Sequence, residues 1–410
     1  MSNALAELAG RLELDLLPGG RPARPLVVLP LDGWRDAPPE LIRRAGDLVA
    51  AALPVTVGVL AGPPSASLEP LVRAATLTLA AGTVAGAGAS TPADARASER
   101  MPVDARVSER MPADARASER MPADARLPAA TPAGGGPRAI VWTGDLPGAP
   151  DLEQAIGRLR TAVERSPRAA IACGQLVRQT AVLDVPGGLA AEAAAYSLLL
   201  GGPEFARGLG ERGESRHREP SAEPVRVSRD GGRLSIVLDD PARRNAFSAP
   251  LREALLGALL VGELDQTIES IELSGAGPAF CSGGDLDEFG TAKDLVAAYL
   301  VRLSRAPWRV IARIAGKVTV RAHGACVGAG TEMAAYAGRV VAAPDAFFAL
   351  PEVGMGLVPG AGGSVSVPRR IGRWRTAWLA LTGDRLPAAT ALRWGLVDEI
   401  TPTSLNPPSQ

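Results

Sequence analysis

Strands alternate with helices over residues 225–400, and this alternation constrains the fold more than any other feature of the sequence. Apolar runs bounded by glycine, proline and aspartate mark the strands, and a helical apolar period marks the segments between them. We expect a hairpin, a helix, a strand, a helix, a strand–turn–helix unit and a strand–turn–strand unit at 225–240, 249–264, 270–275, 293–304, 316–337 and 339–363. Such alternation predicts an α/β domain built on a largely parallel sheet.

Two glycine-rich turns follow predicted strands in this region. The first is GAGPAFCSGGD at 275–285, and the second is GACVGAGTE at 324–332, which leads directly into a helix. Glycine lets backbone amides point outward toward a ligand, and one amide from each turn could bracket a carbonyl oxygen as an oxyanion hole. Neither turn has the spacing of a phosphate-binding loop. Tight packing alone would also explain the glycines, so both interpretations stay open.

Two glutamates in this region are the next candidates for chemistry. Glu332 falls in the first turn of the predicted helix, and Glu352 follows a strand in LPEVGMG. Glu332 could simply stabilise the helix dipole, and Glu352 could be a surface turn residue. Both are flanked by apolar residues, however, and a buried pair of carboxyls has raised and separated pKa values. Such a pair could supply one base and one acid at neutral pH.

The composition excludes several classes of function. The formal net charge is +0 and only 4% of residues are aromatic, which disfavours a nucleic-acid-binding or membrane-surface protein. The three cysteines are scattered and there are only two histidines, so we expect no metal site and a reducing, cytoplasmic location. We find neither a signal peptide nor an apolar run long enough for a membrane span. His323 and Cys281 have no evident catalytic partner and are interpreted as structural.

The first half of the chain, residues 1–207, also has an α/β pattern but no convincing catalytic constellation. A ten-residue repeat, ADARASERMP and its variants, occupies much of an insert at about 90–136. A proline in each repeat blocks a long helix and the units carry little apolar surface, so we predict a disordered insert. The polar segment 208–224 is predicted to be a linker, followed by a catalytic domain at 225–410.

The second half resembles the enoyl-CoA hydratase/isomerase family, the crotonase superfamily. The likeness runs from about Arg233 to Ile400, and its five blocks occur in the family's order. They are ARRNAFS, GAGPAFCSGGDLDEF, AHGACVGAGTEMA, FALPEVGMGLVPGAGGS and ALRWGLVDEI. The resemblance implies the crotonase-like ββα spiral for this domain and an acyl-CoA thioester as its partner. Coenzyme A would be the carrier of the substrate, with no other cofactor.

The resemblance also implies roles for individual residues. The amides of Gly284 and Ala329 would form the oxyanion hole, and Glu332 and Glu352 would be the two acidic residues of the hydratases. It assigns substrate and CoA contacts to Arg243, Arg244, Ala246, Gly283, Asp285 and Gly328. The implied reaction is hydration of a 2-enoyl-CoA. The alternatives are isomerisation, dehydration or C–C bond hydrolysis on the same fold, and a non-catalytic acyl-CoA-binding scaffold.

The family's late helices are expected after the GLVDEI block, but only ten residues follow Ile400. This puts the family's trimers and hexamers in doubt for this chain. The segment 187–209 resembles those late helices, and 25–34 and 55–62 resemble early strands of the family. We therefore interpret the first half as a degenerate crotonase-like region whose last helices cover the open side of the second half.

Overall fold

The computed structural model describes residues 2–83, 140–212 and 221–401. Its largest sheet has six strands in the order β15-β12-β10-β9-β8-β7, and all neighbours are parallel except β7 and β8. In chain order the strands are Val225–Asp230, Arg233–Leu238, Ser270–Gly275, Val318–Ala322, Arg339–Ala342 and Glu399–Ile400. The prediction of a largely parallel sheet in this half is confirmed.

A three-stranded sheet continues from the large one and carries the turns of interest. It consists of β11 (Ala325–Val327), β13 (Phe347–Ala349) and β14 (Leu386–Pro387), with β13 in the middle. The helices of this half are α8 to α14, at Ala249–Leu264, Leu295–Ser304, Pro307–Arg313, Ala329–Ala334, Gly363–Ile371, Arg373–Thr382 and Ala388–Trp394. Helix α8 begins where predicted, because the Ser248 hydroxyl accepts a hydrogen bond from the amide of Leu251.

The N-terminal region has a separate four-stranded parallel sheet in the order β3-β4-β5-β6. Its strands are Leu26–Pro30, Val55–Leu60, Leu77–Ala80 and Val141–Trp142. Helices α1 to α4 accompany it at Ser2–Leu12, Pro39–Ala51, Glu69–Ala74 and Leu152–Arg165, with a small β1–β2 hairpin at 16–22. The α/β pattern of this region is confirmed, whereas its relation to the crotonase fold stays a prediction.

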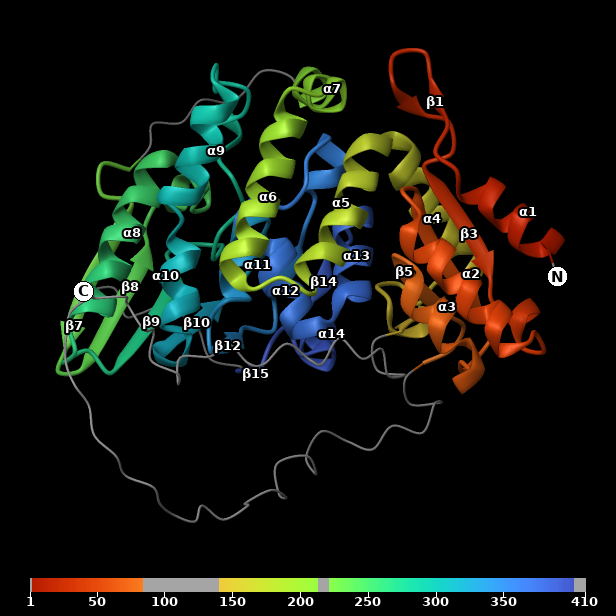
Figure 1. Cartoon of the computed structure of the whole chain (residues 1–410). Helices are drawn as coiled ribbons and strands as arrows, with labels where there is room; N and C mark the ends of the chain where they lie inside the picture. Colours follow the sequence, from red (N-terminus) through yellow and green to blue (C-terminus); the bar gives the residue numbers. More distant parts are fainter. Residues whose placement is uncertain (1, 84–139, 213–220, 402–410) are drawn as a thin grey trace, which may run out of the picture.

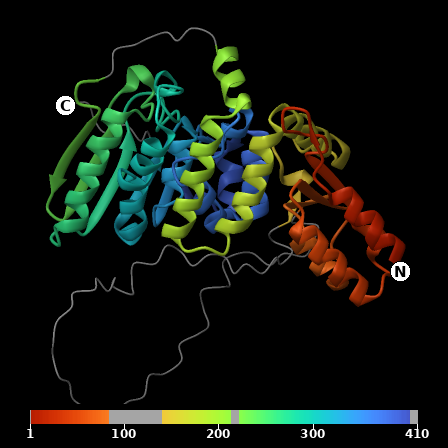
Figure 2. The same cartoon turned by 45° about the horizontal axis from the view of Figure 1, so that its top comes forward.

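Three helices connect the two halves: α5 (Pro167–Thr180), α6 (Val185–Leu200) and α7 (Pro203–Arg212). Figures 1 and 2 both show α6 standing against the C-terminal half, with α5 between α6 and the N-terminal region. Helix α5 packs on α12 and α13 and also on β4 of the N-terminal sheet. Helix α6 packs on α9 and α12, and the Thr180 hydroxyl donates to the carbonyl oxygen of Ser364 at 2.6 Å. The buried apolar residues form one continuous core through both halves.

The predictions for the linker and for the repeat insert have different outcomes. Helix α7 continues to Arg212, so the predicted start of the linker, residue 208, falls inside a helix. The repeat insert at about 90–136 lies outside the described residues, as does the middle of the linker. Among the described helices we find none with the length and apolarity needed to cross a bilayer.

Candidate active site

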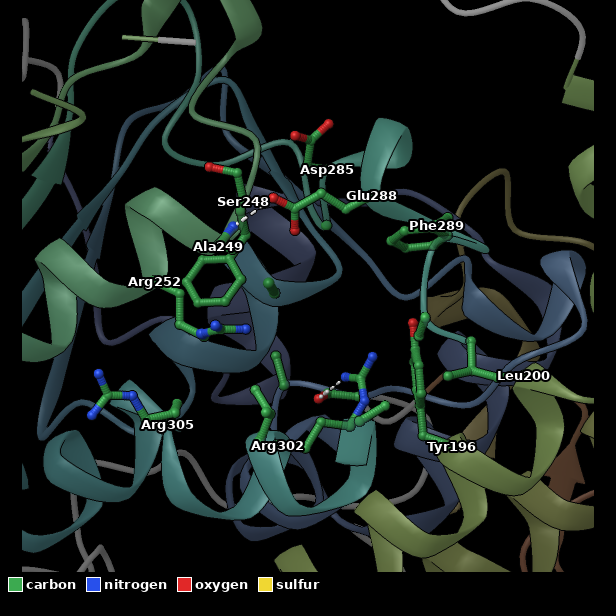
Figure 3. Close-up of a pocket in the computed structure, with 18 of the residues that line it drawn as sticks. Tyr196, Leu200, Ser248, Ala249, Arg252, Asp285, Glu288, Phe289, Arg302 and Arg305 are labelled. Atoms are coloured by element: carbon green, nitrogen blue, oxygen red, sulfur yellow. Dashed lines mark hydrogen bonds between the residues drawn. The ribbon is translucent and has the colours of Figure 1, made fainter. Parts of the chain in front are cut away.

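A cavity of about 510 Å³ opens between α6, α8, α9 and the two glycine-rich turns. Figure 3 shows Tyr196 and Leu200 of α6 on one side and Ser248, Ala249 and Arg252 on the other. The inner wall of the cavity includes Gly284, Ala329, Glu332 and Glu352. The structure therefore brings together the four residues that were predicted as oxyanion hole and catalytic pair.

The backbone amides of Gly284 and Ala329 reach the cavity from different elements. Gly284 lies in the loop after β9, where Phe247 donates to the carbonyl of Gly283 and accepts from the amide of Asp285. Ala329 is the first residue of α11, so its amide has no intrahelical acceptor. Neither amide has a hydrogen-bond acceptor among the residues that the structure describes. Both donors are thus available to a ligand oxygen.

Gly328 occupies a backbone conformation that favours glycine, with φ 49° and ψ −118°. A Cβ atom at this position would lie 2.5 Å from Oε1 of Glu352. This close approach lets the Gly328 backbone turn sharply into α11 while the carboxyl group of Glu352 packs directly against it.

Glu332 is buried in the wall of the cavity, with 1% of its surface exposed. Its Oε2 atom accepts hydrogen bonds from the amides of Ala361 and Gly363, each at 2.7 Å. Burial raises the pKa of Glu332 well above its ordinary value, and the charges of Glu352 and Glu192 raise it further. The two amides oppose this rise because they stabilise the carboxylate form.

Glu352 begins a short 3-10 helix, Glu352–Met355, immediately after β13. It is also buried, and its Oε2 atom has no hydrogen-bond partner in the described part of the chain. Burial raises the pKa of Glu352 to about 8, so this carboxyl group is mostly protonated at neutral pH. Glu352 is buried, so the surface-turn interpretation of this residue is wrong. Glu332 lies in the first turn of α11, so the helix-dipole interpretation stays open for it beside the catalytic one.

A third buried glutamate, Glu192 of α6, comes from the N-terminal half. Its carboxylate accepts from the amides of Gly362 and Ser364 and from the Ser364 hydroxyl, at 2.6, 2.8 and 2.6 Å. Burial raises the pKa of Glu192 to about 7, against the opposing effect of these donors and of Arg302. Sequence reasoning missed this residue, although a single glutamate within the apolar run AAEAAAYSLLL was a usable signal.

Arginines that the sequence did not single out also line the cavity. Arg302 of α9 stacks over the ring of Tyr196, with its guanidinium carbon 3.5 Å from the ring centroid, and donates to the carbonyl of Gly360 (Figure 3). Arg252 and Arg305 lie nearer the rim, and both pair with Glu253. These cations make the entrance favourable to an anionic ligand.

The residues predicted to contact CoA lie in several environments. Asp285 lines the cavity, whereas Arg243, Arg244, Ala246, Gly283 and Gly328 do not. The Arg243 guanidinium is 9% exposed and forms an ion pair with Asp285 at 2.7 Å. Arg244 is exposed and has a left-handed backbone. The structure thus places Arg243 in an internal ion pair that holds Asp285 beside the first glycine-rich turn.

His323 and Cys281 lie outside the cavity, in line with a structural role. The Nε2 atom of His323 is 2.9 Å from the carbonyl oxygen of Gly277. Cys281 is fully buried, and burial raises the pKa of its thiol to about 12, so no reactive thiolate forms there.

Comparison with known proteins decides the family. Residues 229–405 match the family described as enoyl-CoA hydratase/isomerase. The 2,3-dehydroadipyl-CoA hydratase of Escherichia coli is 33% identical over 44% of this chain and 69% of its own length. The chain belongs to the enoyl-CoA hydratase/isomerase family. Its C-terminal half therefore has the crotonase-like fold that the resemblance implied.

The relatives of this family member do not share one reaction. The 1,2-epoxyphenylacetyl-CoA isomerase of Escherichia coli is 34% identical over 41% of this chain and 66% of its own length. The crystal structure of an enoyl-CoA hydratase from Thermoplasma volcanium has 32% identity and a TM-score of 0.41, covering 44% of this chain and 73% of its own. The chain spans about two thirds of the length of the curated relatives that it matches.

Proposed function

We propose that the protein adds water across the double bond of a 2-enoyl-CoA thioester through an oxyanion-stabilised enolate. The observation that carries this proposal is the placement of two buried carboxyl groups and two acceptor-free amides on the wall of one cavity. A thioester oxygen between the amides of Gly284 and Ala329 would receive both donors as negative charge develops on it. The two Escherichia coli relatives are named for acyl-CoA substrates, which supports the same substrate class here.

The hydrogen-bond partners of the two glutamates favour different roles. Glu332 accepts from two amides, which stabilise its charged form and suit a base that removes a proton from water. The hydroxide equivalent then bonds to C3 of the enoyl group, and the π electrons move to the thioester oxygen. Glu352, whose raised pKa keeps it protonated, donates its proton to C2 as the carbonyl re-forms. A proton returning from Glu332 to Glu352 resets the site.

Substitution of each glutamate tests the assignment. Glu332→Gln and Glu352→Gln are each expected to lower kcat for crotonyl-CoA hydration by roughly 10²- to 10⁴-fold, as for loss of a general acid or base. The matched control is Glu204→Gln. Glu204 is a buried glutamate of α7 that accepts from the amides of Arg168 and Ala169 and does not line the cavity. The proposal fails if both variants at 332 and 352 turn over every acyl-CoA like the wild type.

Isomerisation is the second candidate, because one of the similar relatives is an isomerase. Moving a double bond needs proton transfer between two carbons of the substrate but no water. A 3-enoyl-CoA substrate and ¹⁸O-labelled water separate the two reactions: hydration incorporates the label into the product, and isomerisation does not. Binding of acyl-CoA without any turnover would instead indicate a non-catalytic scaffold.

A further inference from the structure

Glu192 takes no part in the proposed chemistry, yet it is buried beside the residues that do. We infer that Glu192 is a positioning residue, supplied by the N-terminal half, which fixes the loop that orients Glu332. The hydrogen bonds around Glu192 carry this inference, and its kinetic test rests on the proposed function. The loop in question is residues 360–364, which follows the 3-10 helix at Glu352–Met355 and includes the first two residues of α12.

The amides of this loop alternate between two carboxylates. Those of Ala361 and Gly363 donate to Glu332, and those of Gly362 and Ser364 donate to Glu192. The backbone bends at Gly362, with φ 90° and ψ 9°, just before α12 begins, and the four amides around this bend are held between the two side chains. A displacement that lengthens the bonds to Glu192 must also displace the donors of Glu332.

Close packing leaves the loop little freedom to compensate. A Cβ atom on Gly360 would collide with the ring of Tyr196, and one on Gly188 would lie 2.9 Å from a methyl group of Val365. The Thr180 hydroxyl holds the carbonyl of Ser364 from α5. Helices of the N-terminal half therefore define the position of this loop from one side, while Glu332 occupies the other.

The charge of Glu192 also reaches the catalytic pair. Its negative charge raises the pKa of Glu332 and of Glu352. The other groups that face it are Arg302 of α9, whose charge opposes its raised pKa, and Cys173 of α5 and Tyr336 after α11, whose pKa values it raises. Removing this charge should therefore lower the pKa of Glu352 and move the loss of activity at high pH to lower pH.

The informative variant is Glu192→Gln in the full-length chain. The glutamine has the same size, but its NH₂ group must face one of the donors that the carboxylate accepts, so at least one loop contact is lost. We expect kcat for crotonyl-CoA to fall roughly ten- to hundredfold and KM to change less. The loss of activity at high pH should begin at lower pH than in the wild type. Glu192→Asp keeps the charge on a shorter side chain. Its kcat should fall, while the pH at which activity is lost should stay near the wild-type value.

Glu204→Gln is the matched control, since it removes the charge of another buried glutamate that accepts backbone amides but does not contact this loop. Its pH profile should not shift. A second readout needs no turnover: the Glu332 and Glu352 carboxyl carbons of ¹³C-glutamate-labelled protein, assigned with the 332 and 352 variants, should titrate at lower pH in Glu192→Gln.

Equal kinetics, pH profiles and carboxyl titrations for Glu192→Gln and Glu204→Gln would overturn the inference and leave the proposed function standing. A wild-type protein that turns over no enoyl-CoA would overturn the proposed function, and the carboxyl titrations would then decide the inference. If Glu192→Gln does not fold, the same comparison is made with Glu192→Asp, for which unchanged kcat would overturn the inference.

Discussion

The polar groups at strand ends are paired differently in the N-terminal sheet and in the C-terminal half. At the edge of the N-terminal sheet, the amide of Ala61 donates to Asp32, which also pairs with Arg35. Burial alone would raise the pKa of Asp32, but the Ala61 amide and the Arg35 guanidinium lower it overall. Asp32 and the Ala61 amide are thus each paired with a neighbour.

In the C-terminal half, the amides of Gly284 and Ala329 have no acceptor within the described residues, and Glu352 has a buried oxygen without a partner. A polar group without a hydrogen-bond partner destabilises a folded protein, so such groups are rare and often mark a functional site. Both halves have parallel strands, but only the C-terminal half shows these unpaired groups at its cavity. The strand pattern alone therefore does not identify a ligand-binding site.

The largest effect that this comparison predicts is for loss of the Ala329 amide in the C-terminal half. Ala329→Pro removes the free N–H at the first position of α11, where proline is tolerated. The cavity then has one amide donor fewer for a ligand oxygen. We expect kcat to fall by about 10²- to 10³-fold, as for loss of one oxyanion donor. Ala329→Gly keeps the amide and should retain most of the turnover. Circular dichroism checks the fold, and equal kcat values for the two variants would contradict the role.

A pair of glycine substitutions sharpens the contrast between activity and stability. In Gly328→Ala the new Cβ meets Oε1 of Glu352 at 2.5 Å with φ at 49°, and in Gly58→Ala it meets Leu31 at 2.8 Å in the N-terminal core. Each should lower the free energy of unfolding by about 1–3 kcal/mol, measured in urea. Only Gly328→Ala should also lower kcat, by roughly tenfold. A matching loss of kcat in Gly58→Ala would remove the distinction.

A further expected effect is a difference between the two regions in the pH dependence of stability. Glu352 has a folded pKa of about 8, above its unfolded value, so the native state binds more protons and stability falls as pH rises from about 4.5 to 8. The slope for one proton is at most about 1.4 kcal/mol per pH unit. Glu352→Gln should flatten this decline in urea unfolding experiments.

Asp32 should act with the opposite sign, because its folded pKa is lowered. Its stabilising contribution is present above the unfolded pKa and is lost as pH falls through the folded one. Asp32→Asn should therefore lower stability near neutral pH and little in strong acid. Parallel pH profiles for the Asp32 and Glu352 variants would show that the two carboxyl groups do not differ as described.

The sequence predicted those parts of the molecule that depend on local pattern. The hairpin at 225–240, the strand at 270–275 and the glycine turns follow from neighbouring residues, and Glu332 ends the second of these turns. The short helix α10 was missed because it follows α9 after only two residues. The strand at Leu77–Ala80 was missed because it is brief and lies beside the repeat insert.

Contacts between distant segments were beyond the sequence. Arg243 was predicted to run beside CoA phosphates, but its partner in the structure, Asp285, lies in a different loop. Glu192 was not recognised because its donors, Gly362 and Ser364, come from the other end of the chain. The expectation that the 187–209 segment covers the C-terminal half agrees with the packing of α6 on α9 and α12, but the role of its carboxylate depends on that packing and not on local pattern.

The loop held between Glu192 and Glu332 has a consequence for biosynthesis. A ribosome makes α6 well before residues 360–364, so Glu192 leaves the exit tunnel without the amides that later satisfy it. Until they arrive, burying its carboxyl group would leave that group without the donors it has in the folded protein. Because Gly360 and Ala361 also line the cavity, its wall is complete only after this late segment has been made.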